Sequence, residues 1–354
     1  MRFIVISTSI GFLGSGRGGG VELTLNSLVN GLLNKGHSVS VVAPFNSRLS
    51  KSCTKAELFC VDGEEPKSWQ HKDYYSPIPK IVNSITNAML EKAMRLADNA
   101  DLIINLSFDW LPISITNKTK IPIAHLISMG DESFEIRELI SKMYNTHPNH
   151  FAFHSKSQAA DYSFITNPII VGNGFNLDNY KFHDSMNGAL AWVGRVAPEK
   201  GLEDAVFVAN ELKEKINVWG IVQDEEYAKN IEKSFPSANI SWKGFKETNQ
   251  LQEQLRLSRA LINTPKWNEA YGNVVVEAMA CGVPVVAYKR GGPSEIIQHG
   301  KNGFLVTPDD KQEIISFLKR INEINRKDCR KWVENNASSE IFSEKIIKWI
   351  KKII

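Results

Sequence analysis

The stretch "NEAYGNVVVEAMACGVPVVAYKRGGPSEII", residues 268–297, decides how the fold is interpreted, because it places two glutamates around a tight turn and continues as an apolar run. Glu269 precedes the turn at Gly272 and Asn273, and Glu277 follows it. The run after the turn predicts a helix capped by Gly272 or Asn273. The free N–H groups at the start of such a helix, together with its dipole, form a site for an anionic group.

The two glutamates lie on opposite sides of this predicted anion site. Glu277 is one turn inside the helix, where its carboxylate can accept hydrogen bonds from both hydroxyls of a ribose. Glu269 lies before the turn, where it can meet the group that a diphosphate carries, such as a sugar. The spacing therefore predicts a nucleotide on one side, a diphosphate at the turn and a sugar beyond it. The turn residues expected to line the site are Tyr271, Gly272, Asn273 and Val274.

A second motif upstream supplies positive charge. The stretch "WVGRVAPEKG", residues 192–201, ends a predicted strand with Arg195 and adds Lys200 five residues later. Two cations at one strand end can neutralise a leaving diphosphate without a metal. The sequence has no Asp-x-Asp motif and no His/Asp cluster with metal-ligand spacing, so no metal is expected. A single Arg or Lys is more often a solvated surface charge, so the inference depends on all these features occurring together.

Short Val- and Ile-rich runs alternate with amphipathic stretches along the chain, which is typical of a doubly wound parallel sheet. The predicted strands are 3–7, 38–43, 102–106, 122–127, 151–155, 190–194, 217–222, 240–244, 260–263 and 284–288. A helix over 21–35, ending at Gly36, lies between the first two. These strands are too many for one comfortable sheet. We therefore expect an α/β protein of two Rossmann-like domains that face each other across a cleft, with ligands at the strand C-termini.

The turn-rich stretch 167–188 separates the two series of strands. It predicts an N-terminal domain over 1–170 and a C-terminal domain over 171–339. The last segment, 340–354, is a basic stretch with apolar residues at helical spacing: Phe342, Ile346, Trp349, Ile350 and Ile353. Such a helix could lie on a membrane surface. We expect it to pack on the protein instead, because any helix of a globular protein needs one apolar face.

Composition narrows the class of protein. The chain has 354 residues, of which 42% are hydrophobic and 23% charged, as in an ordinary globular protein of two domains. A net charge of +3 is too small to indicate a nucleic-acid partner. Four scattered cysteines without metal-ligand spacing indicate reduced thiols and a cytoplasmic location. The N-terminal "MRFIVISTSI" predicts a strand rather than a signal peptide, and no apolar run is long enough to span a membrane.

The loop "GFLGSGRGGGVE" satisfies the pattern G-x-G-x-x-G at Gly14, Gly16 and Gly19, as in NAD-dependent dehydrogenases. Two features count against that activity. The loop is longer than the usual tight turn, and the second strand ends "VVAPFN" without the carboxylate that would bind a ribose. What remains is the expectation that Gly18 to Gly20 present N–H groups to an anion at the start of helix 21–35. The alternative is a loop that binds nothing.

Three stretches carry a resemblance to a known family: "GGGVE", "WVGRVAPEKGLEDA" and "EAYGNVVVEAMACGVPVVAYKRGGPSEII…GKNGFLV". They resemble the family-4 retaining glycosyltransferases of the GT-B fold, over nearly the whole chain. The resemblance implies a hexosyltransferase with a UDP-sugar donor, no metal and no other cofactor. One departure is that Ala270 and Tyr271 stand where the family has Pro or Gly followed by Phe. The change keeps an aromatic residue.

The resemblance implies roles for the residues of the two motifs. Glu277 binds the ribose hydroxyls, and Glu269 contacts the donor sugar near its reacting face. Arg195 and Lys200 hold the diphosphate. No side chain of the motifs is placed as a covalent nucleophile, so retention implies attack from the front face, with the departing phosphate oxygen taking the acceptor proton.

The resemblance also implies roles elsewhere in the chain. Gly19 and Gly20 approach the phosphate, and His125 of "IPIAHLISMGD" contacts the sugar. From the residues alone, His125 would be a strand-end histidine with satisfied hydrogen bonds. Phe245 ends "WKGF", a strand end placed to flank a base, for which the resemblance implies uridine. The resemblance also implies that the last helix, 340–354, packs back on the N-terminal domain.

The acceptor is expected on the N-terminal domain. Phe108, Asp109 and Trp110 of "NLSFDWLP" follow a strand, and aromatics beside a carboxylate suit a flat heterocycle with N–H donors, or a sugar ring. The alternative is that Asp109 caps the following turn and that Trp110 belongs to the core.

These stretches, with Met129 of "HLISMGDE" and Glu22 of "GSGRGGGVELTL", resemble the cyanobacterial UDP-glucose:tetrahydrobiopterin glucosyltransferases. That resemblance implies UDP-glucose as donor and a reduced pterin as acceptor. An enzyme of exopolysaccharide or lipid-linked glycan synthesis is the alternative, and it would touch a membrane. A non-catalytic sensor of nucleotide sugars would need a damaged motif, and none is damaged.

Overall fold

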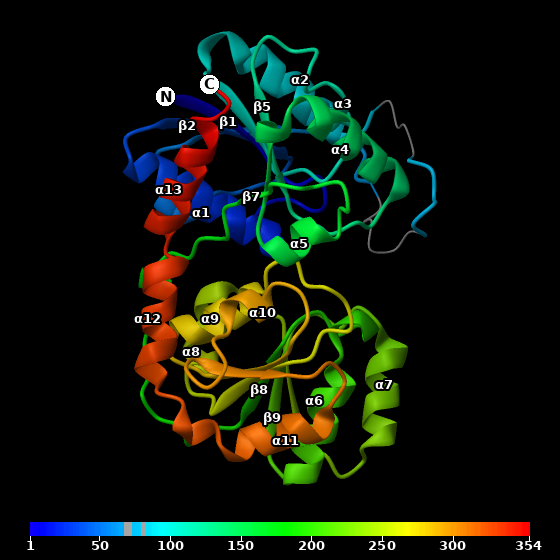
Figure 1. Ribbon diagram of the computed structural model, residues 1–354, viewed down its shortest axis with the longest axis vertical. Coiled ribbons are helices and arrows are strands. Elements are labelled where there is room, and N and C mark those ends of the chain that lie inside the picture. Colours follow the sequence, from blue (N-terminus) through cyan, green and yellow to red (C-terminus); the bar gives the residue numbers. More distant parts are fainter. Residues whose placement is uncertain (67–72, 79–82) are drawn as a thin grey trace. The chain divides into compact units, whose positions relative to one another are not determined.

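The computed structural model describes residues 1–66, 73–78 and 83–354, which form two compact units. The first unit contains Met1–Phe175 and Ser339–Ile354, and the second contains Asn176–Ser338 (Figure 1). The first boundary thus falls inside the turn-rich stretch 167–188, five residues beyond the expected end of the N-terminal domain at 170. The final helix is part of the first unit.

The described part of the first unit forms one seven-stranded parallel sheet in the order β3-β2-β1-β4-β5-β6-β7. Its strands are β1 (Arg2–Ile6), β2 (Ser38–Pro44), β3 (Glu57–Val61), β4 (Leu102–Asn105), β5 (Ile123–Ile127), β6 (Phe151–Phe153) and β7 (Ile169–Ile170). Its helices are α1 (Gly20–Asn34), α2 (Ile85–Leu96), α3 (Trp110–Ser114), α4 (Phe134–Thr146), α5 (Lys156–Ala160) and α13 (Ser339–Ile350).

The second unit forms a six-stranded parallel sheet in the order β10-β9-β8-β11-β12-β13. Its strands are β8 (Leu190–Val193), β9 (Ile216–Trp219), β10 (Ile240–Gly244), β11 (Ala260–Asn263), β12 (Val285–Tyr288) and β13 (Gly303–Val306). Its helices are α6 (Leu202–Leu212), α7 (Glu225–Ser234), α8 (Thr248–Leu255), α9 (Asn273–Ala280), α10 (Pro293–Ile296), α11 (Lys311–Lys319) and α12 (Arg326–Asn336). Short 3₁₀ turns lie at Lys51–Cys53, Ala97–Asn99, Pro148–His150, Leu177–Asn179, Pro198–Lys200 and Ile321–Glu323.

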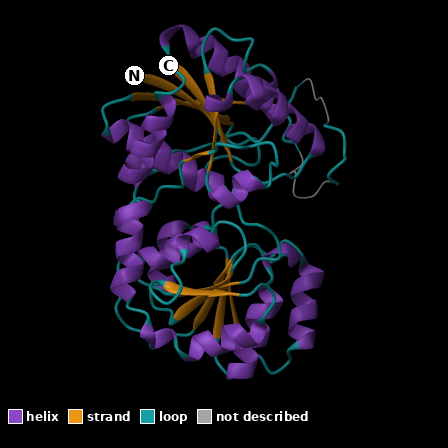
Figure 2. Cartoon of the chain, viewed as in Figure 1, coloured by secondary structure: helices purple, strands orange, loops and turns teal. Residues whose placement is uncertain are grey.

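Both sheets are doubly wound, with helices packed around one sheet in each unit (Figure 2). Every predicted strand occurs at its expected place, so the expected α/β fold of two parallel-sheet domains is confirmed. Three strands, β3, β7 and β13, were not expected. The strand β3 is half exposed and β7 has two residues, so neither carries the continuous apolar signal of a buried strand.

The apolar face of α13 is buried within the first unit. Phe342, Ile346, Trp349 and Ile350 join the same apolar cluster as α1 and the strand residues of β1 and β2 (Figure 1). The helices approach closely, since a Cβ at Gly31 of α1 would lie 2.6 Å from the Ser343 side chain. Burying one large apolar side chain stabilises a protein by about 1.5–3 kcal/mol. The apolar face of α13 is therefore used in packing within the first unit, as expected. This packing leaves no apolar face of this helix for a membrane surface.

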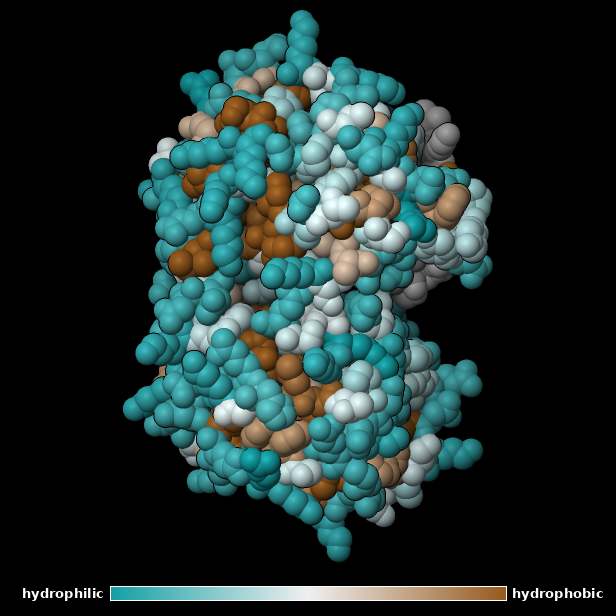
Figure 3. Space-filling view, viewed as in Figure 1, coloured by the Kyte–Doolittle hydropathy of each residue, from teal (hydrophilic) through white to brown (hydrophobic). Residues whose placement is uncertain are grey.

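The described residues contain no helix that is long and apolar enough to cross a membrane. On the face drawn in Figure 3, apolar side chains occur as separate patches among polar ones.

Candidate functional site

The order of strands in the second unit reverses between β8 and β11, which lie side by side. In doubly wound sheets this switch point, at the carboxyl ends of the strands, is where ligands bind. Arg195 and Lys200 follow β8, and Glu269 follows β11. Residues that lie far apart in the sequence therefore meet at one edge of the sheet.

Lys200 and Glu269 form an ion pair between Nζ and Oε1, with both side chains less than one-fifth exposed. The indole of Trp267 completes the group: its Nε1 donates to Glu269 Oε1 at 3.0 Å, and its ring lies 4.6 Å below Lys200 Nζ. Burial alone would raise the pKa of Glu269, but the charge of Lys200 and the two hydrogen bonds outweigh it and lower the pKa. Glu269 is thus an anion beside a cation at the switch point.

Arg195 lies next to this pair on the turn after β8. Its guanidinium donates to the Gln223 side chain and pairs with Glu199 at 3.1 Å, and it is about one-third exposed. An isolated bridge joins Val196 to Val222, which brings Gln223 to the same edge of the sheet. Because part of its side chain is exposed, an incoming anion can reach Arg195.

The predicted helix after the turn is α9, and Gly272 is its N-cap residue with φ of 100°. This left-handed conformation favours glycine, and a Cβ there would lie 2.9 Å from Pro293 Cγ. Tyr271 precedes the cap, and the backbone of Asn273 and Val274 forms the first turn. The structure therefore places all four predicted turn residues at one helix N-terminus.

Glu277 lies on α9 and is almost fully buried. Tyr180 Oη donates to Glu277 Oε1 at 3.3 Å, and Gln252 Nε2 donates to the same oxygen at 3.2 Å. Burial raises the pKa of Glu277 to about 7, although both hydrogen bonds act to lower it. Among the described residues, Oε2 has no hydrogen-bond partner, so that oxygen remains for a ligand.

Phe245 follows β10 and is 48% exposed. Ile221, which the sequence interpretation did not single out, follows the neighbouring strand β9 and is 41% exposed. Exposed apolar side chains at adjacent strand ends provide a surface that a flat ring can cover.

Tyr180 and Gln252 were also missed, because they reach Glu277 from segments that carry no motif. Trp267 was missed although it lies two residues before Glu269, because a single aromatic residue carries no pattern of its own.

In the first unit the glycine loop is held by its own glutamate. Glu22 accepts hydrogen bonds from the backbone N of Gly14 at 2.7 Å and of Gly18 at 2.9 Å. Gly19 is the N-cap of α1 and its N–H points to the Gly16 carbonyl at 3.3 Å, while Gly20 begins the helix. The Glu22 carboxylate thus takes the place at Gly14 and Gly18 that an external anion would need. Its predicted contact with an acceptor would require these bonds to break.

His125 lies on β5 with no exposed surface. Its two ring nitrogens lie 3.1 Å from Asn105 Nδ2 and 2.8 Å from Thr116 Oγ1. Burial, with a smaller contribution from His150, lowers the pKa of His125 to about 3. This geometry favours the alternative of a strand histidine with satisfied hydrogen bonds over a histidine that contacts a sugar.

Asp109 is the N-cap residue of α3, where Oδ1 accepts from the Leu111 N–H at 3.0 Å. Its other oxygen accepts from Thr86 Oγ1 at 3.1 Å. Phe108, Trp110 and Met129 pack partly buried against an apolar cluster of the first unit. The structure therefore favours the capping and core alternatives for this group over an open acceptor surface.

Replacing Asp109 by alanine is expected to lower the free energy of unfolding by about 1–3 kcal/mol, because the helix loses its cap and Thr86 loses its acceptor. Urea denaturation measures this change. The Asp109→Asn variant keeps an acceptor and is expected to lose less. Unchanged stability in both variants would contradict the capping role and favour the predicted role of Asp109 in binding the acceptor.

Over residues 1–66, 73–78 and 83–354, no group of three or more His, Cys, Asp or Glu side chains is arranged to hold a metal ion. Whether the reaction needs a metal is a separate question. The diphosphate-binding role predicted for Arg195 and Lys200 leads us to expect that it needs none.

Comparisons with known proteins agree with the fold and relate part of the chain to a known family. Residues 178–350 match the family described as glycosyl transferases group 1. An uncharacterized glycosyltransferase of Methanocaldococcus jannaschii is 27% identical over 253 residues, which cover 67% of this chain and 69% of the relative. A sucrose synthase of Solanum tuberosum is 26% identical over 197 residues, which cover 51% of this chain but 24% of the relative. The match thus spans about a quarter of that relative's length.

Solved structures extend the likeness in fold to the whole chain. The Anabaena protein HepE, crystallised with UDP and glucose, has a TM-score of 0.74 at 17% identity, with 99% of each chain covered. The sucrose-phosphate synthase of Thermosynechococcus elongatus has a TM-score of 0.81 at 15% identity, with 100% of this chain and 99% of that chain covered. Both parallel-sheet units therefore have counterparts in one known architecture.

Proposed function

We propose that this chain, whose residues 178–350 match the family described as glycosyl transferases group 1, is a retaining glycosyltransferase that moves a hexosyl group, glucose in the first instance, from a UDP-sugar to an acceptor hydroxyl. The observation that carries the proposal is the group at the switch point of the second unit. There Lys200, which follows β8, pairs with Glu269, and Glu269 shares one segment of chain with the N-terminus of α9 and the buried Glu277.

The donor is held by three features of the second unit. The ribose hydroxyls donate to Glu277, whose Oε2 is available. The diphosphate is held by Arg195, Lys200 and the N-terminus of α9, which supply positive charge and backbone donors. The uracil lies against Phe245 and Ile221, which are both exposed. HepE, which resembles this chain in fold, was crystallised with UDP and glucose, and this supports a UDP-glucose donor.

In the reaction, the bond between the sugar C1 and the β-phosphate oxygen breaks as the acceptor oxygen bonds to C1 on the same face. The acceptor hydroxyl gives its proton to the departing phosphate oxygen, which becomes part of UDP. Lys200 and Arg195 stabilise the negative charge that develops on that phosphate. Glu269 lies beside Lys200, where it can hold the sugar hydroxyls and orient C1.

The acceptor is the finer part of the proposal. Tetrahydrobiopterin is the acceptor that the sequence resemblance implies, and a hydroxyl of a growing glycan is the alternative. The Asp109 carboxylate, which was expected to accept from the N–H donors of a flat heterocycle, accepts from Thr86 and Leu111 instead. Pterin recognition would therefore use other groups of the first unit.

Purified protein is expected to bind UDP in calorimetry and to release UDP from UDP-glucose, faster when a suitable acceptor is present. Parallel reactions with reduced pterin and with oligosaccharide acceptors separate the two acceptor classes. Absence of UDP binding at millimolar concentration would exclude the proposed donor.

The same turnover is expected to persist in EDTA, because two cations and a helix N-terminus neutralise the leaving diphosphate. The rate of UDP release with and without chelator measures this. Complete loss of activity in EDTA that magnesium restores would show that a metal shares the role given to Arg195 and Lys200.

A further inference from the structure

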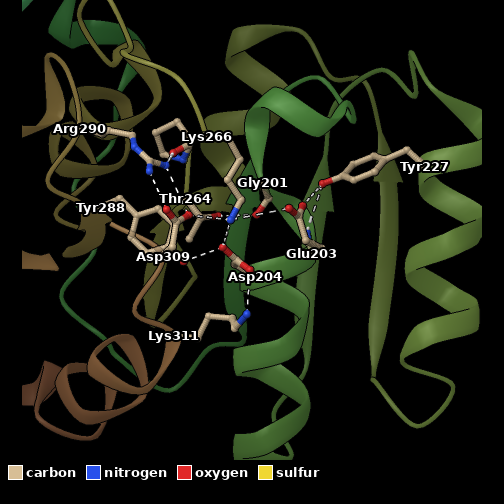
Figure 4. A network of polar contacts seen from close by, with 11 residues as sticks. Gly201, Glu203, Asp204, Tyr227, Thr264, Lys266, Tyr288, Arg290, Asp309 and Lys311 are labelled. Carbon is tan, nitrogen blue, oxygen red and sulfur yellow. Dashed lines mark hydrogen bonds and ion pairs between the residues drawn. The ribbon is translucent and has the colours of Figure 1, made fainter. Parts of the chain in front are cut away.

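A network of charged side chains lies at the carboxyl edge of the second sheet and includes none of the residues proposed to touch the donor (Figure 4). Lys266, in the loop after β11, pairs with Asp204 of α6 and with Asp309 Oδ1 at 2.9 Å. Arg290, just after β12, pairs with Asp309 Oδ2 at 2.7 Å. We call Lys266, Asp204, Asp309 and Arg290 the edge network. Its two cations and two anions balance one another, so it needs no ligand for neutrality.

The edge network is anchored in the interior on one side. The Asp204 side chain is only 5% exposed, and Tyr288 Oη donates to its Oδ2 at 2.6 Å. A buried carboxylate is stable only where it is paired and hydrogen-bonded. The buried Asp204 carboxylate therefore has a defined position, and its ion pair holds the ammonium end of the Lys266 side chain.

The loop that carries Lys266 also contacts the backbone on both sides of Lys200. The Lys266 backbone N–H donates to the Glu199 carbonyl at 2.8 Å, and Thr264 Oγ1 donates to the Gly201 carbonyl at 2.7 Å. A Cβ at Gly201 would lie 2.0 Å from the Thr264 carbonyl oxygen, so the two segments are in backbone contact. Both chain neighbours of Lys200 are thus held by the segment that begins at Thr264.

Arg290 holds the same segment from its other side. Its NH1 donates to the Pro265 carbonyl at 2.9 Å. Two residues further on, the Gly292 N–H donates to the Glu269 carbonyl at 2.7 Å, and a Cβ at Gly291 would lie 2.4 Å from the Glu269 backbone. The turn that directly follows Arg290 is therefore in backbone contact with Glu269.

We propose that the edge network, and Lys266 above all, is a positioning device that sets the geometry of the Lys200–Glu269 pair without touching the substrate. The inference rests on the proposed function, since it names residues that act on that site through others. A displacement of about 1 Å at reacting groups can lower a rate about 100-fold, so a cross-link of this kind affects turnover more than binding. Glu277 is bound to Tyr180 and Gln252 instead, so UDP binding depends less on the network.

The test compares Lys266→Met with Lys311→Met. Methionine keeps most of the aliphatic chain of Lys266 and removes the ammonium group. Lys311 of α11 is a matched control, because its Nζ contacts the same Asp204, at 3.6 Å from Oδ1, but it is not joined to the segment from Thr264 to Glu269. We expect kcat for UDP release to fall about 10- to 100-fold in Lys266→Met, with UDP Kd changed less than about fivefold. Lys311→Met is expected to keep the wild-type kcat.

Hydrogen exchange provides a readout that needs no activity. Peptides that contain the amides of Lys266 and Gly292 are expected to exchange faster in Lys266→Met and to stay protected in Lys311→Met. The Lys266→Arg variant keeps the charge and is expected to recover most of the rate and the protection. Unchanged exchange and kcat in Lys266→Met would overturn the inference, as would equal losses in both methionine variants. Faster exchange in a protein that binds no UDP would uphold the positioning role and exclude the proposed function.

Discussion

Replacing Lys200 by methionine is expected to lower kcat for UDP-glucose turnover by about 100- to 1000-fold, the usual effect of removing one group that stabilises developing charge. The ammonium of Lys200 is held against Glu269 and over the ring of Trp267, so its position is set before the donor arrives. UDP affinity is expected to fall less, because the proposed phosphate contacts of Arg195 and the N-terminus of α9 remain. Single-turnover kinetics with UDP-glucose separates the two effects.

The Lys200→Met variant is also expected to change the pKa of Glu269. Without Lys200, burial is expected to raise the pKa of Glu269, because the charge that lowered it is gone.

Lys319→Met, at an exposed position on α11, is the matched control and is expected to leave kcat unchanged. A wild-type kcat in Lys200→Met would remove this residue from the leaving-group site.

Replacing Glu277 by glutamine is expected to weaken UDP binding by roughly 1–3 kcal/mol, or roughly 5- to 150-fold, because the ribose loses charged hydrogen bonds. The fold is expected to tolerate the change, since a neutral amide is easier to bury than a carboxylate. Calorimetry measures the affinity, and thermal unfolding checks the fold. The control is Glu323→Gln, which removes an exposed carboxylate paired with Arg320.

The pH dependence of UDP binding gives the same residue a second test. Burial raises the pKa of Glu277 to about 7, and only the ionised carboxylate accepts both ribose hydroxyls. UDP affinity is therefore expected to fall roughly tenfold between pH 8 and pH 6. Stability changes in the opposite sense: the pKa is higher in the folded state, so the contribution is present below about pH 4.5 and is lost as pH rises through about 7.

The phosphates of UDP also titrate in this range, so the wild-type profile must be compared with that of Glu277→Gln. The variant keeps the phosphate contribution and lacks that of the carboxylate. Parallel pH profiles in the two proteins, or an unchanged affinity in the variant, would remove Glu277 from the ribose.

The fold could be read from the sequence largely because parallel strands are buried on both faces. The run of β12 and that of β1 after Arg2 are apolar, and their short length and β-branched residues favour buried strands over helices. The strand β3 was missed because an edge strand has one neighbour, so its "ELFCV" sequence needs less apolar surface. The strand β7 was missed because two residues carry no pattern.

The candidate site was predictable where its residues sit at the ends of elements. Lys200, Glu269 and Gly272 follow strands whose carboxyl ends share one edge of the sheet, so their proximity follows from the topology. His125 and Asp109 also lie at or after strands, yet their side chains are buried and hydrogen-bonded within the first unit. Position at a strand end therefore indicates a site, but the direction and partners of the side chain decide whether the residue belongs to it.

By itself, the sequence determined the two parallel-sheet units, the helix after the turn at Gly272 and the edge of the sheet at which charged residues gather, because periodicity, glycine conformation and strand order are local or topological properties. Only the tertiary structure decided which charges pair. Lys266 and Asp204 are 62 residues apart and Lys266 and Asp309 are 43 apart, and no spacing rule joins them. Their contact depends on the registers of four strands and the loops that leave them, and those are set by packing of the whole core.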